Sequence, residues 1–384
     1  MSKLYGRISI PILIILICNS YPNLPNISYL QPIKYYSFFE IPLTSKKTRL
    51  KLSVKSFPPN NIPNPACIAH RLCFNLLFGL HKNFSKRKNI LSAMTKTLAA
   101  SELILNPDGS LYHCNLLPEN LGDTVFLVGD PDRVPTVSAF FDTVDFKTQK
   151  REIVTHTGTK NGKKVTVIST GMGTDNIDIV LTELDAVVNI DLQKKQLKDT
   201  HKQLTFIRLG TSGSLQKDIP VDSFLASTHG LGMDGLLHFY KNSEAFTYNP
   251  FVEKFIEETE WSSKLSRPYL VEGDEELIQK AKDLGFYTGV TATACGFYGP
   301  QGRVLRLDVQ DDSLNEKLSS FEYNGLKITN FEMETSAIFG LSKLLGHKAI
   351  SINCIIANRF SGEYSKDYKK SVQIMIEKVL NNFI

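Results

Sequence analysis

Motifs that identify several large enzyme classes are missing from this chain of 384 residues. It has no H-E-x-x-H pair, no G-x-x-x-x-G-K-[ST] loop and no G-x-S-x-G elbow, which argues against the common zinc peptidases, P-loop nucleotidases and serine hydrolases. Metal-ligand spacings of cysteine are also missing. We expect Cys114, Cys295 and Cys354 to be free thiols in a cytoplasmic protein, and we predict no metal centre.

Acidic residues are almost missing from the first 93 positions, which hold 13 Lys and Arg residues against one acid, Glu40. The same stretch holds 9 of the 17 prolines and only 2 of the 24 glycines. The net charge of +5 therefore averages a leader of +12 with a remainder of −7. Because the basic excess is confined to the leader, it does not predict nucleic-acid binding by the remaining residues.

Residues 1–93 thus form an atypical basic N-terminal extension, and three interpretations of it stay open. Translation could begin at Met94, so that the preceding residues come from non-coding sequence. A targeting segment is the second interpretation, because residues 8–18 form an apolar run behind Lys3 and Arg7. That run is shorter than a membrane span, and no small-x-small cleavage site follows it. The third interpretation is a functional basic arm.

Residues 94–384 alternate short apolar runs with helical patterns, which is typical of a single α/β domain. The predicted strands are 124–129, 164–170, 204–210, 223–228, 287–293, 327–333 and 349–357. The predicted helices are 175–190, 274–284, 334–345 and 366–383, the third ended by Gly346. Several of the strands are apolar on both faces, as a sheet covered by helices requires.

Three predicted strands end in glycine-rich polar turns, the position at which open α/β sheets bind ligands. Gly129 and Arg133 follow the first strand, residues 169–173 (STGMG) follow the second, and Arg208 precedes Thr211 in the third. Backbone amides at glycines and the guanidinium fork both suit phosphate. Each turn alone could be an ordinary one, but three together favour a phosphate-sized pocket.

Two further segments carry groups that suit a nucleoside. In residues 331–334 (FEME), Glu334 could accept two adjacent ribose hydroxyls above Met333, although a glutamate there could also simply cap the following helix. In residues 297–303 (FYGPQGR), an aromatic ring offers a stacking face for a base. Gln301 both donates and accepts hydrogen bonds and Arg303 only donates, which matches the edge of uracil.

The order and spacing of these segments resemble the nucleoside phosphorylase family, and in particular its uridine phosphorylases, from about Tyr112 to the C-terminus. The resemblance implies one domain with a central mixed, partly barrel-like sheet flanked by helices. It also implies a homodimer or homohexamer, because two residues of each site come from a neighbouring subunit. Inorganic phosphate is then the co-substrate, and no organic cofactor, membrane or nucleic acid is expected as a partner.

The resemblance assigns roles to matching positions of this chain. The phosphate-binding residues are Gly129, Arg133, Arg208, Thr211 and, from the neighbouring subunit, Arg151, which lies in a K-R-E-I stretch similar to the family's H-R-E-F strand. The ribose-binding residues are Met333, Glu334 and the neighbour's His113. The base-binding residues are Phe297, Gln301, Arg303 and Arg359. Catalysis is then expected from Arg133, Arg208, Arg303 and Glu334.

Some positions depart from the family's pattern. Some members bind a monovalent cation between subunits through the glutamate of the H-R-E-F strand and a serine; here Glu152 is present but Asn176 replaces the serine, which puts the cation in doubt. Asn358 stands where purine-cleaving relatives have an aspartate that protonates the base. Because an amide cannot act as that acid, the substitution favours a pyrimidine.

These observations predict the reversible phosphorolysis of uridine to uracil and ribose 1-phosphate in pyrimidine salvage. Other pyrimidine nucleosides are further candidate substrates. Alternatives that stay open are a nucleosidase or a purine nucleoside phosphorylase of the same fold, and a catalytically silent nucleoside-binding protein. A nucleosidase would not need the phosphate clamp and would need an acid at the base. A silent binding protein would need no phosphate clamp at all.

Overall fold

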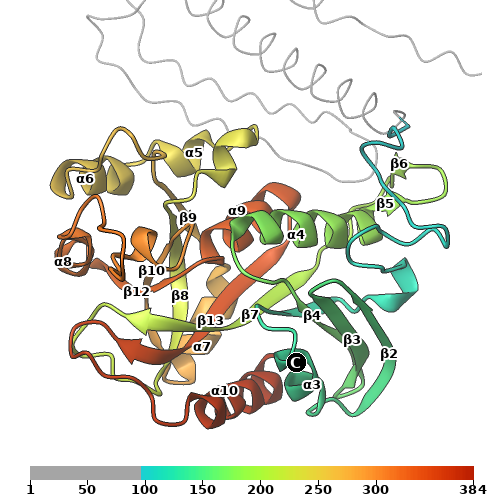
Figure 1. Cartoon of the computed structure of the whole chain (residues 1–384). Coiled ribbons are helices and arrows are strands. Elements are labelled where there is room, and N and C mark those ends of the chain that lie inside the picture. The colour runs from blue at the N-terminus through green and yellow to red at the C-terminus, as the bar shows by residue number, and fades with distance from the viewer. Residues whose placement is uncertain (1–96) are drawn as a thin grey trace, which may run out of the picture. The chain divides into compact units, whose positions relative to one another are not determined.

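The computed structural model describes residues 97–384 (Figure 1). Its strands are β1 (Thr124–Val128), β2 (Thr143–Lys150), β3 (Ile153–Lys160), β4 (Lys163–Ser169), β5 (Ile190–Asp191), β6 (Gln196–Leu197), β7 (Thr205–Ser214), β8 (Phe224–Gly232), β9 (Tyr269–Glu272), β10 (Tyr287–Thr293), β11 (Glu322–Tyr323), β12 (Leu326–Glu332) and β13 (Lys348–Asn358). The α-helices are α3 (Arg133–Ser138), α4 (Thr174–Asn189), α5 (Glu244–Thr247), α6 (Pro250–Glu258), α7 (Glu275–Asp283), α8 (Leu314–Ser320), α9 (Thr335–Leu345) and α10 (Tyr368–Phe383). Short 3₁₀ turns are η1 (Pro118–Asn120), η2 (Leu236–Phe239) and η3 (Gly299–Gln301).

One sheet of 11 strands runs through the described segment, in the order β11-β12-β10-β8-β13-β7-β1-β4-β3-β2, with β9 added beside β8. A further pairing of β12 with β7 closes five of these strands, β7, β12, β10, β8 and β13, into a ring. Parallel and antiparallel pairs both occur, for example β1 with β7 and β13 with β8. The predicted mixed, partly barrel-like sheet in one domain is therefore confirmed.

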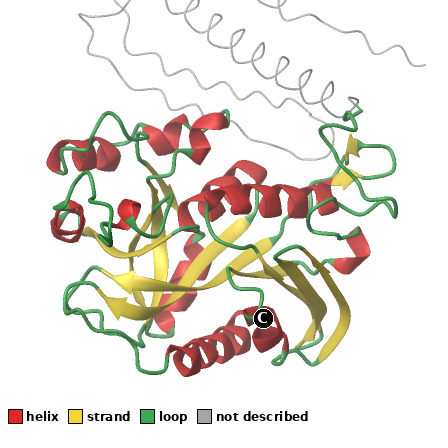
Figure 2. Ribbon diagram, in the orientation of Figure 1, coloured by secondary structure: helices red, strands yellow, loops and turns green. Residues whose placement is uncertain are grey.

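Helices cover both faces of this sheet (Figure 2). In the view of Figure 1, α4 and α9 lie above the sheet and α3 and α10 below it. The central strand β1 explains the arrangement, because Val125 and Leu127 pack toward one buried cluster while Phe126 and Val128 pack toward another. Apolar side chains on both faces of a strand require a cover on each side.

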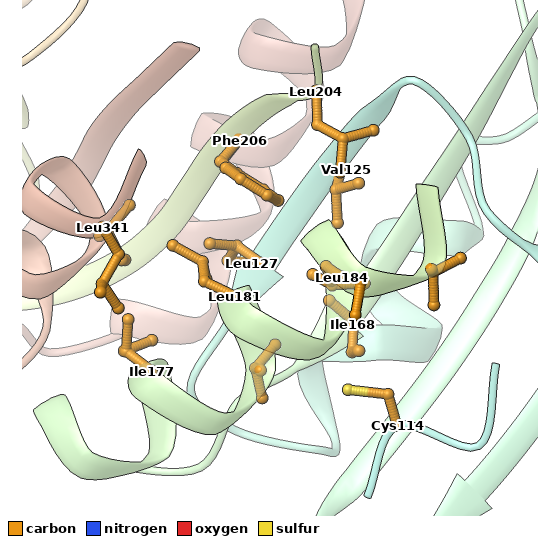
Figure 3. Close-up of a cluster of buried hydrophobic side chains, with 14 of the residues drawn as sticks. Cys114, Val125, Leu127, Ile168, Ile177, Leu181, Leu184, Leu204, Phe206 and Leu341 are labelled. Atoms are coloured by element: carbon orange, nitrogen blue, oxygen red, sulfur yellow. The ribbon is translucent and has the colours of Figure 1, made fainter. Parts of the chain in front are cut away.

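Helix α4 is held by a stripe of apolar residues with helical spacing. Ile177, Leu181 and Leu184 point toward the side chains of β1 and β4, and Leu341 of α9 completes the contact (Figure 3). All of these side chains are almost completely buried. This packing fixes the N-terminus of α4, and with it the Gly-rich turn that precedes the helix, against the sheet.

The seven predicted strands and four predicted helices all form, with three differences of detail. Strand β7 continues to Ser214, so Thr211 lies within a strand rather than in a turn after it, because β13 pairs with β7 throughout this stretch and β12 joins at Gly213 and Ser214. Strand β8 also continues to Gly232. The stretch that contains Arg151 is a two-residue turn between β2 and β3, not a strand, and Arg151 has a positive φ of 53°.

Two predictions concern membrane-spanning segments and the N-terminal extension. Among residues 97–384, no helix combines the length and the apolar character that a membrane crossing needs. The interpretations of the basic extension, including the apolar run 8–18 and a start at Met94, concern positions outside the described residues.

Candidate active site

The candidate site lies where several strand ends meet the start of α9. Gly129 follows β1, and a Cβ built on it would lie 3.3 Å from the carbonyl oxygen of Gly171, which follows β4. From the same turn, Gly173 donates its N–H to Oε1 of Glu334, at 2.7 Å. Glu334 in turn contacts Arg208 in β7. The structure thus brings Gly173 into contact with Glu334, which is 161 residues away in the sequence.

Arg208 is the central cation of this site and is only 6% exposed. Its Nη2 forms an ion pair with Glu334 and lies 3.4 Å from Oε2 of Glu332. Its Nη1 donates to Oδ1 of Asn353 at 2.9 Å. A buried guanidinium requires such partners, because an unpaired charge in the interior is very costly.

Gly210 provides the space that Arg208 occupies. A Cβ built on Gly210 would lie 1.6 Å from Nη1 of Arg208 and 2.6 Å from Oδ1 of Asn353. No side chain fits at that distance, so the guanidinium can fold back along its own strand only because residue 210 is glycine. This is a packing reason for the glycine in the R-L-G-T-S-G segment.

The two glutamates before α9 have different tasks. Glu332 accepts hydrogen bonds from the backbone N–H groups of Glu334 and Thr335 and from Oγ1 of Thr293, so it caps the helix. Burial raises the pKa of Glu332, and the charge of Arg208 opposes that rise. The helix-capping role considered for this segment therefore falls to Glu332. Glu334 directs its carboxylate toward Arg208 and Gly173 instead.

Arg133 adds a second positive charge beside Arg208. It is the first residue of α3, and its Nη1 donates to the carbonyl oxygen of Leu209 at 3.1 Å. Burial and the nearby positive charge of Arg208 lower the pKa of Arg133. Two neighbouring buried guanidinium groups favour the binding of an anion. Thr211 lies three residues after Arg208 in β7, in register with Cys354 of β13.

A second group of predicted residues forms the loop after β10. Gln301 is buried, and its Oε1 accepts a hydrogen bond from Nη1 of Arg303 at 2.6 Å. Arg303 also stacks on Phe297, with 3.8 Å between the guanidinium carbon and the ring centroid. Arg359 donates to the carbonyl oxygen of Gln301 at 3.2 Å. The four residues predicted to bind the base therefore lie together.

The electrostatics of this loop suit an electron-rich ligand edge. Burial and the neighbouring charge of Arg359 lower the pKa of Arg303 to about 10. Burial also lowers the pKa of Arg359. The loop connects to the phosphate side of the site through β7, because a Cβ on Gly213 would lie 3.7 Å from the side chain of Arg359.

The side chain of Asn358 forms hydrogen bonds with backbone groups. Its Nδ2 donates to the carbonyl oxygens of Gln216 and Ile219, both at 3.0 Å, and its Oδ1 accepts from the N–H groups of Phe360 and Ser361. The amide thus shapes the turn after β13.

The two residues predicted to act on a neighbouring subunit come from the β2–β3 hairpin and from the segment before η1. Arg151 is exposed at the tip of the β2–β3 hairpin. His113 lies before η1, where its Nδ1 is 2.6 Å from Oε1 of Glu183 in α4. Glu152 and Asn176, the positions that correspond to the family's cation ligands, lie near each other, since both side chains are beside Gly171.

One group of side chains has residue types that can bind a metal, but its hydrogen bonds oppose metal binding. Ligand atoms of Asp185, His201 and His347 lie within 4.8 Å of one another. However, Nδ1 of His347 accepts the N–H of Leu204 at 3.1 Å, so its Nε2 carries the proton and donates to Asp185. A metal would require removal of that proton.

Three residues of the site were not predicted from the sequence: Glu332 as the helix cap, Thr293 beside it, and Asn353. A buried asparagine within the apolar run 349–357 was the available signal, because a polar side chain inside such a strand requires a partner.

Comparison with known proteins shows which family the chain is similar to. A family model described as the Phosphorylase superfamily matches residues 123–383. The chain is 27% identical over 295 residues to a uridine phosphorylase of Thermococcus kodakarensis, covering 75% of this chain and 91% of the relative. It is 30% identical over 265 residues to the Escherichia coli uridine phosphorylase, covering 66% and 88%. A DeoD-type purine nucleoside phosphorylase of Bacillus subtilis is 28% identical over 267 residues, covering 68% and 94%.

A solved structure is similar as well. The Trypanosoma brucei nucleoside phosphorylase, described as showing uridine phosphorylase activity, superposes with a TM-score of 0.66 at 30% identity. The match covers 72% of this chain and 98% of that one. The family model alone spans more than half of the sequence. The chain therefore belongs to the phosphorylase superfamily.

Proposed function

We propose that this protein is a pentosyltransferase that catalyses the reversible phosphorolysis of uridine to uracil and ribose 1-phosphate. The observation that carries the proposal is the buried Arg208–Glu334 ion pair beside Arg133. It joins a cationic place for phosphate to a carboxylate for ribose. The similar uridine phosphorylases of three organisms support the same reaction.

In the proposed reaction, an oxygen of phosphate forms a bond to C1′ of the ribose while the bond from C1′ to the base nitrogen breaks. The electron pair of the broken bond moves into the uracil ring. Arg133 and Arg208 hold the phosphate, with Gly129 and Thr211 lining its site. The protein needs no covalent intermediate, since positioning and charge stabilisation supply the catalysis.

Ribose and base are held on either side of the breaking bond. Glu334 accepts the ribose hydroxyls and favours the positive charge that develops on the sugar, with Met333 beside it. Gln301 and Arg303 donate to the oxygens of uracil as the base becomes negative, and Arg359 supports them. Phe297 is 51% exposed, and the base would stack on the side of its ring that Arg303 does not cover.

We further propose that the active form is a homodimer or homohexamer in the cytoplasm, with Arg151 and His113 completing a neighbour's site. The three cysteines of residues 97–384 are free thiols, which supports the cytoplasmic location. Phosphate is the co-substrate and no organic cofactor takes part. Glu152 and Asn176 beside Gly171 are the residues from which a monovalent cation could take ligands.

A substrate panel tests the proposed reaction. The full chain is incubated with uridine or inosine, with and without phosphate, and free base and ribose 1-phosphate are measured. We expect uracil and ribose 1-phosphate only when phosphate is present. Equal uracil release without phosphate would identify a nucleosidase. Faster cleavage of inosine would identify a purine enzyme, and nucleoside binding without turnover would identify a silent binding protein.

A further inference from the structure

A closed ring of polar contacts surrounds the guanidinium of Arg208. Nη1 of Arg208 donates to Oδ1 of Asn353, whose Nδ2 donates to Oγ of Ser351 at 3.3 Å. Ser351 also accepts from Oγ1 of Thr335 at 2.8 Å, and the N–H of Thr335 donates to Oε2 of Glu332. Glu332 closes the ring at Nη2 of Arg208. The ring joins strands β7, β12 and β13 to the first residue of α9.

Strand pairing explains why Asn353 can reach the arginine. In the parallel pair of β7 and β13, Ser351 is in register with Arg208, and Asn353 with Gly210. Because Gly210 has no side chain, the guanidinium bends into the space opposite Asn353. Asn353 is completely buried. Arginine has only donors, so the amide must present its oxygen to Nη1 and its nitrogen to Ser351.

The neutrality of this amide affects the charge available for phosphate. Arg133 and Arg208 contribute two positive charges near the clamp, and Glu332 and Glu334 contribute two carboxylates. A third carboxylate on Arg208 would turn the cluster against an anion. An amide oxygen holds the guanidinium in place without adding a charge.

We propose that Asn353 is a positioning residue for phosphate: it holds the Arg208 guanidinium in the clamp through a neutral acceptor and so adds no third negative charge to the two carboxylates beside it. This proposal rests on the proposed phosphorolysis. It assigns a role to a residue of β13 that does not itself contact the substrates. Ser351 and Thr335 anchor the amide from the other side.

Replacement of Asn353 by aspartate changes the charge with little change of shape. The aspartate can still accept from Arg208 through one oxygen. Its other oxygen faces Ser351, whose hydroxyl can rotate to donate instead of accepting. The local hydrogen bonds can therefore be kept, and the added negative charge is the main difference. Asn353→Ala is the complementary variant, because it removes the acceptor and adds no charge.

A matched control exists in the same sheet. Asn330 in β12 is also completely buried, donates through Nδ2 to Oγ of Ser212 at 2.9 Å and accepts from Oγ1 of Thr291 at 2.8 Å. Asn330→Asp makes the same chemical change against hydroxyl partners, without contact to Arg208. It therefore reports the general effect of a buried carboxylate in the ring of strands.

The experiment measures phosphate binding to the full chain by calorimetry without nucleoside, followed by KM for phosphate and for uridine. We expect Asn353→Asp to weaken phosphate binding about 10- to 100-fold, the size of effect that charge-assisted contacts show. We expect Asn353→Ala to weaken it about three- to tenfold. KM for uridine should stay within about threefold in both variants, and Asn330→Asp should keep phosphate binding within about twofold.

The outcomes separate this proposal from the proposed function. If the wild-type protein binds no phosphate, or releases uracil equally without it, the proposed function fails. If the wild type behaves as proposed but a folded Asn353→Asp binds phosphate within twofold of it, the positioning role is wrong. Should Asn353→Asp not fold, unchanged phosphate binding by Asn353→Ala overturns the proposal instead. Equal losses in Asn353→Asp and Asn330→Asp also contradict it, because the effect would then be general.

Discussion

The carboxylate of Glu334 joins two parts of the candidate site, since one oxygen pairs with Arg208 and the other accepts the N–H of Gly173. The residue proposed for ribose and the residue proposed for phosphate are therefore direct partners inside the protein. Both side chains are almost completely buried. A change at one of them must alter the charge that the other presents to a substrate.

Glu334→Gln separates these two roles. The amide keeps the shape but holds the ribose less strongly, so we expect kcat/KM for uridine to fall about 100- to 1000-fold. Phosphate binding should stay equal or become tighter, because Arg208 loses an anionic partner. Steady-state kinetics and calorimetry measure the two effects. Arg208→Ala is the comparison, in which turnover and phosphate binding should both be lost. Weaker phosphate binding in Glu334→Gln would contradict this division.

Gly210→Ala tests the space beside the arginine. The new methyl group would overlap Nη1 of Arg208, so the guanidinium must leave its place. We expect phosphate affinity to fall about tenfold or more and the protein to lose about 1–3 kcal/mol of stability. Gly213→Ala in the same strand is the control, since its nearest neighbour would be an ordinary contact at 3.7 Å. Similar phosphate affinities in both variants would show that the tight fit has no effect on binding.

Gln301→Ala tests recognition of the base. Gln301 is oriented by Arg303, and its loss removes a group that can both donate to and accept from uracil. We expect kcat/KM for uridine to fall about 10- to 100-fold while that for inosine changes much less, so selectivity relaxes. The ratio of the two values measures this directly. An unchanged ratio would argue that other residues read the base.

Arg151 offers a test of a shared site. We expect Arg151→Ala and Arg208→Ala to be poorly active when each is prepared alone. When the two variants are unfolded together and refolded as a mixture, one site of each mixed pair should combine an intact Arg208 with the partner's intact arginine. Recovery of activity in the mixture, compared with each variant refolded alone, measures the complementation. No recovery despite mixed assembly would place Arg151 outside the neighbour's site.

His156 predicts a dependence of stability on acid. It is buried in β3 against Oγ of Ser138, and burial together with the charge of Lys147 lowers its pKa below the usual value of about 6.5. Between the folded and the unfolded pKa, the unfolded chain therefore binds a proton that the folded chain does not, and stability falls as the pH drops through that range. Urea unfolding between pH 7.5 and 5 should show a smaller loss for His156→Gln. An equal loss in both proteins would exclude this contribution.

Much of the fold follows from local pattern, because β1, β4 and β13 are largely apolar and buried and α4 has a regular apolar stripe. The β2–β3 hairpin escaped prediction for a physical reason. Residues 143–160 are rich in threonine and lysine, and β2 lies at the edge of the sheet with one face exposed. Such a strand needs no apolar run, so its pairing partner decides its conformation.

The candidate site was predictable where residue type alone restricts chemistry, as with Arg208, Glu334 and Gln301. The partners of those residues were not. Asn353 contacts Arg208 across 145 positions of sequence, and the division of labour between the two glutamates depends on which carboxylate meets the helix. The first relationship arises from the register between β7 and β13 and the second from the place where β12 ends and α9 begins, and no short motif records either.

The closure of the strand ring by β12 and β13 also limits when during synthesis this protein can become competent. Arg208 cannot form its contacts until Glu334 and Asn353 have been synthesised. The loop with Gln301 likewise cannot contact Arg359, which follows the last strand, until that residue has been added. A nascent chain on the ribosome therefore lacks both its anion clamp and its base pocket until nearly the whole sequence has emerged. Intermediates of translation then have no partial activity, and the long sequence separations predict slow maturation after release.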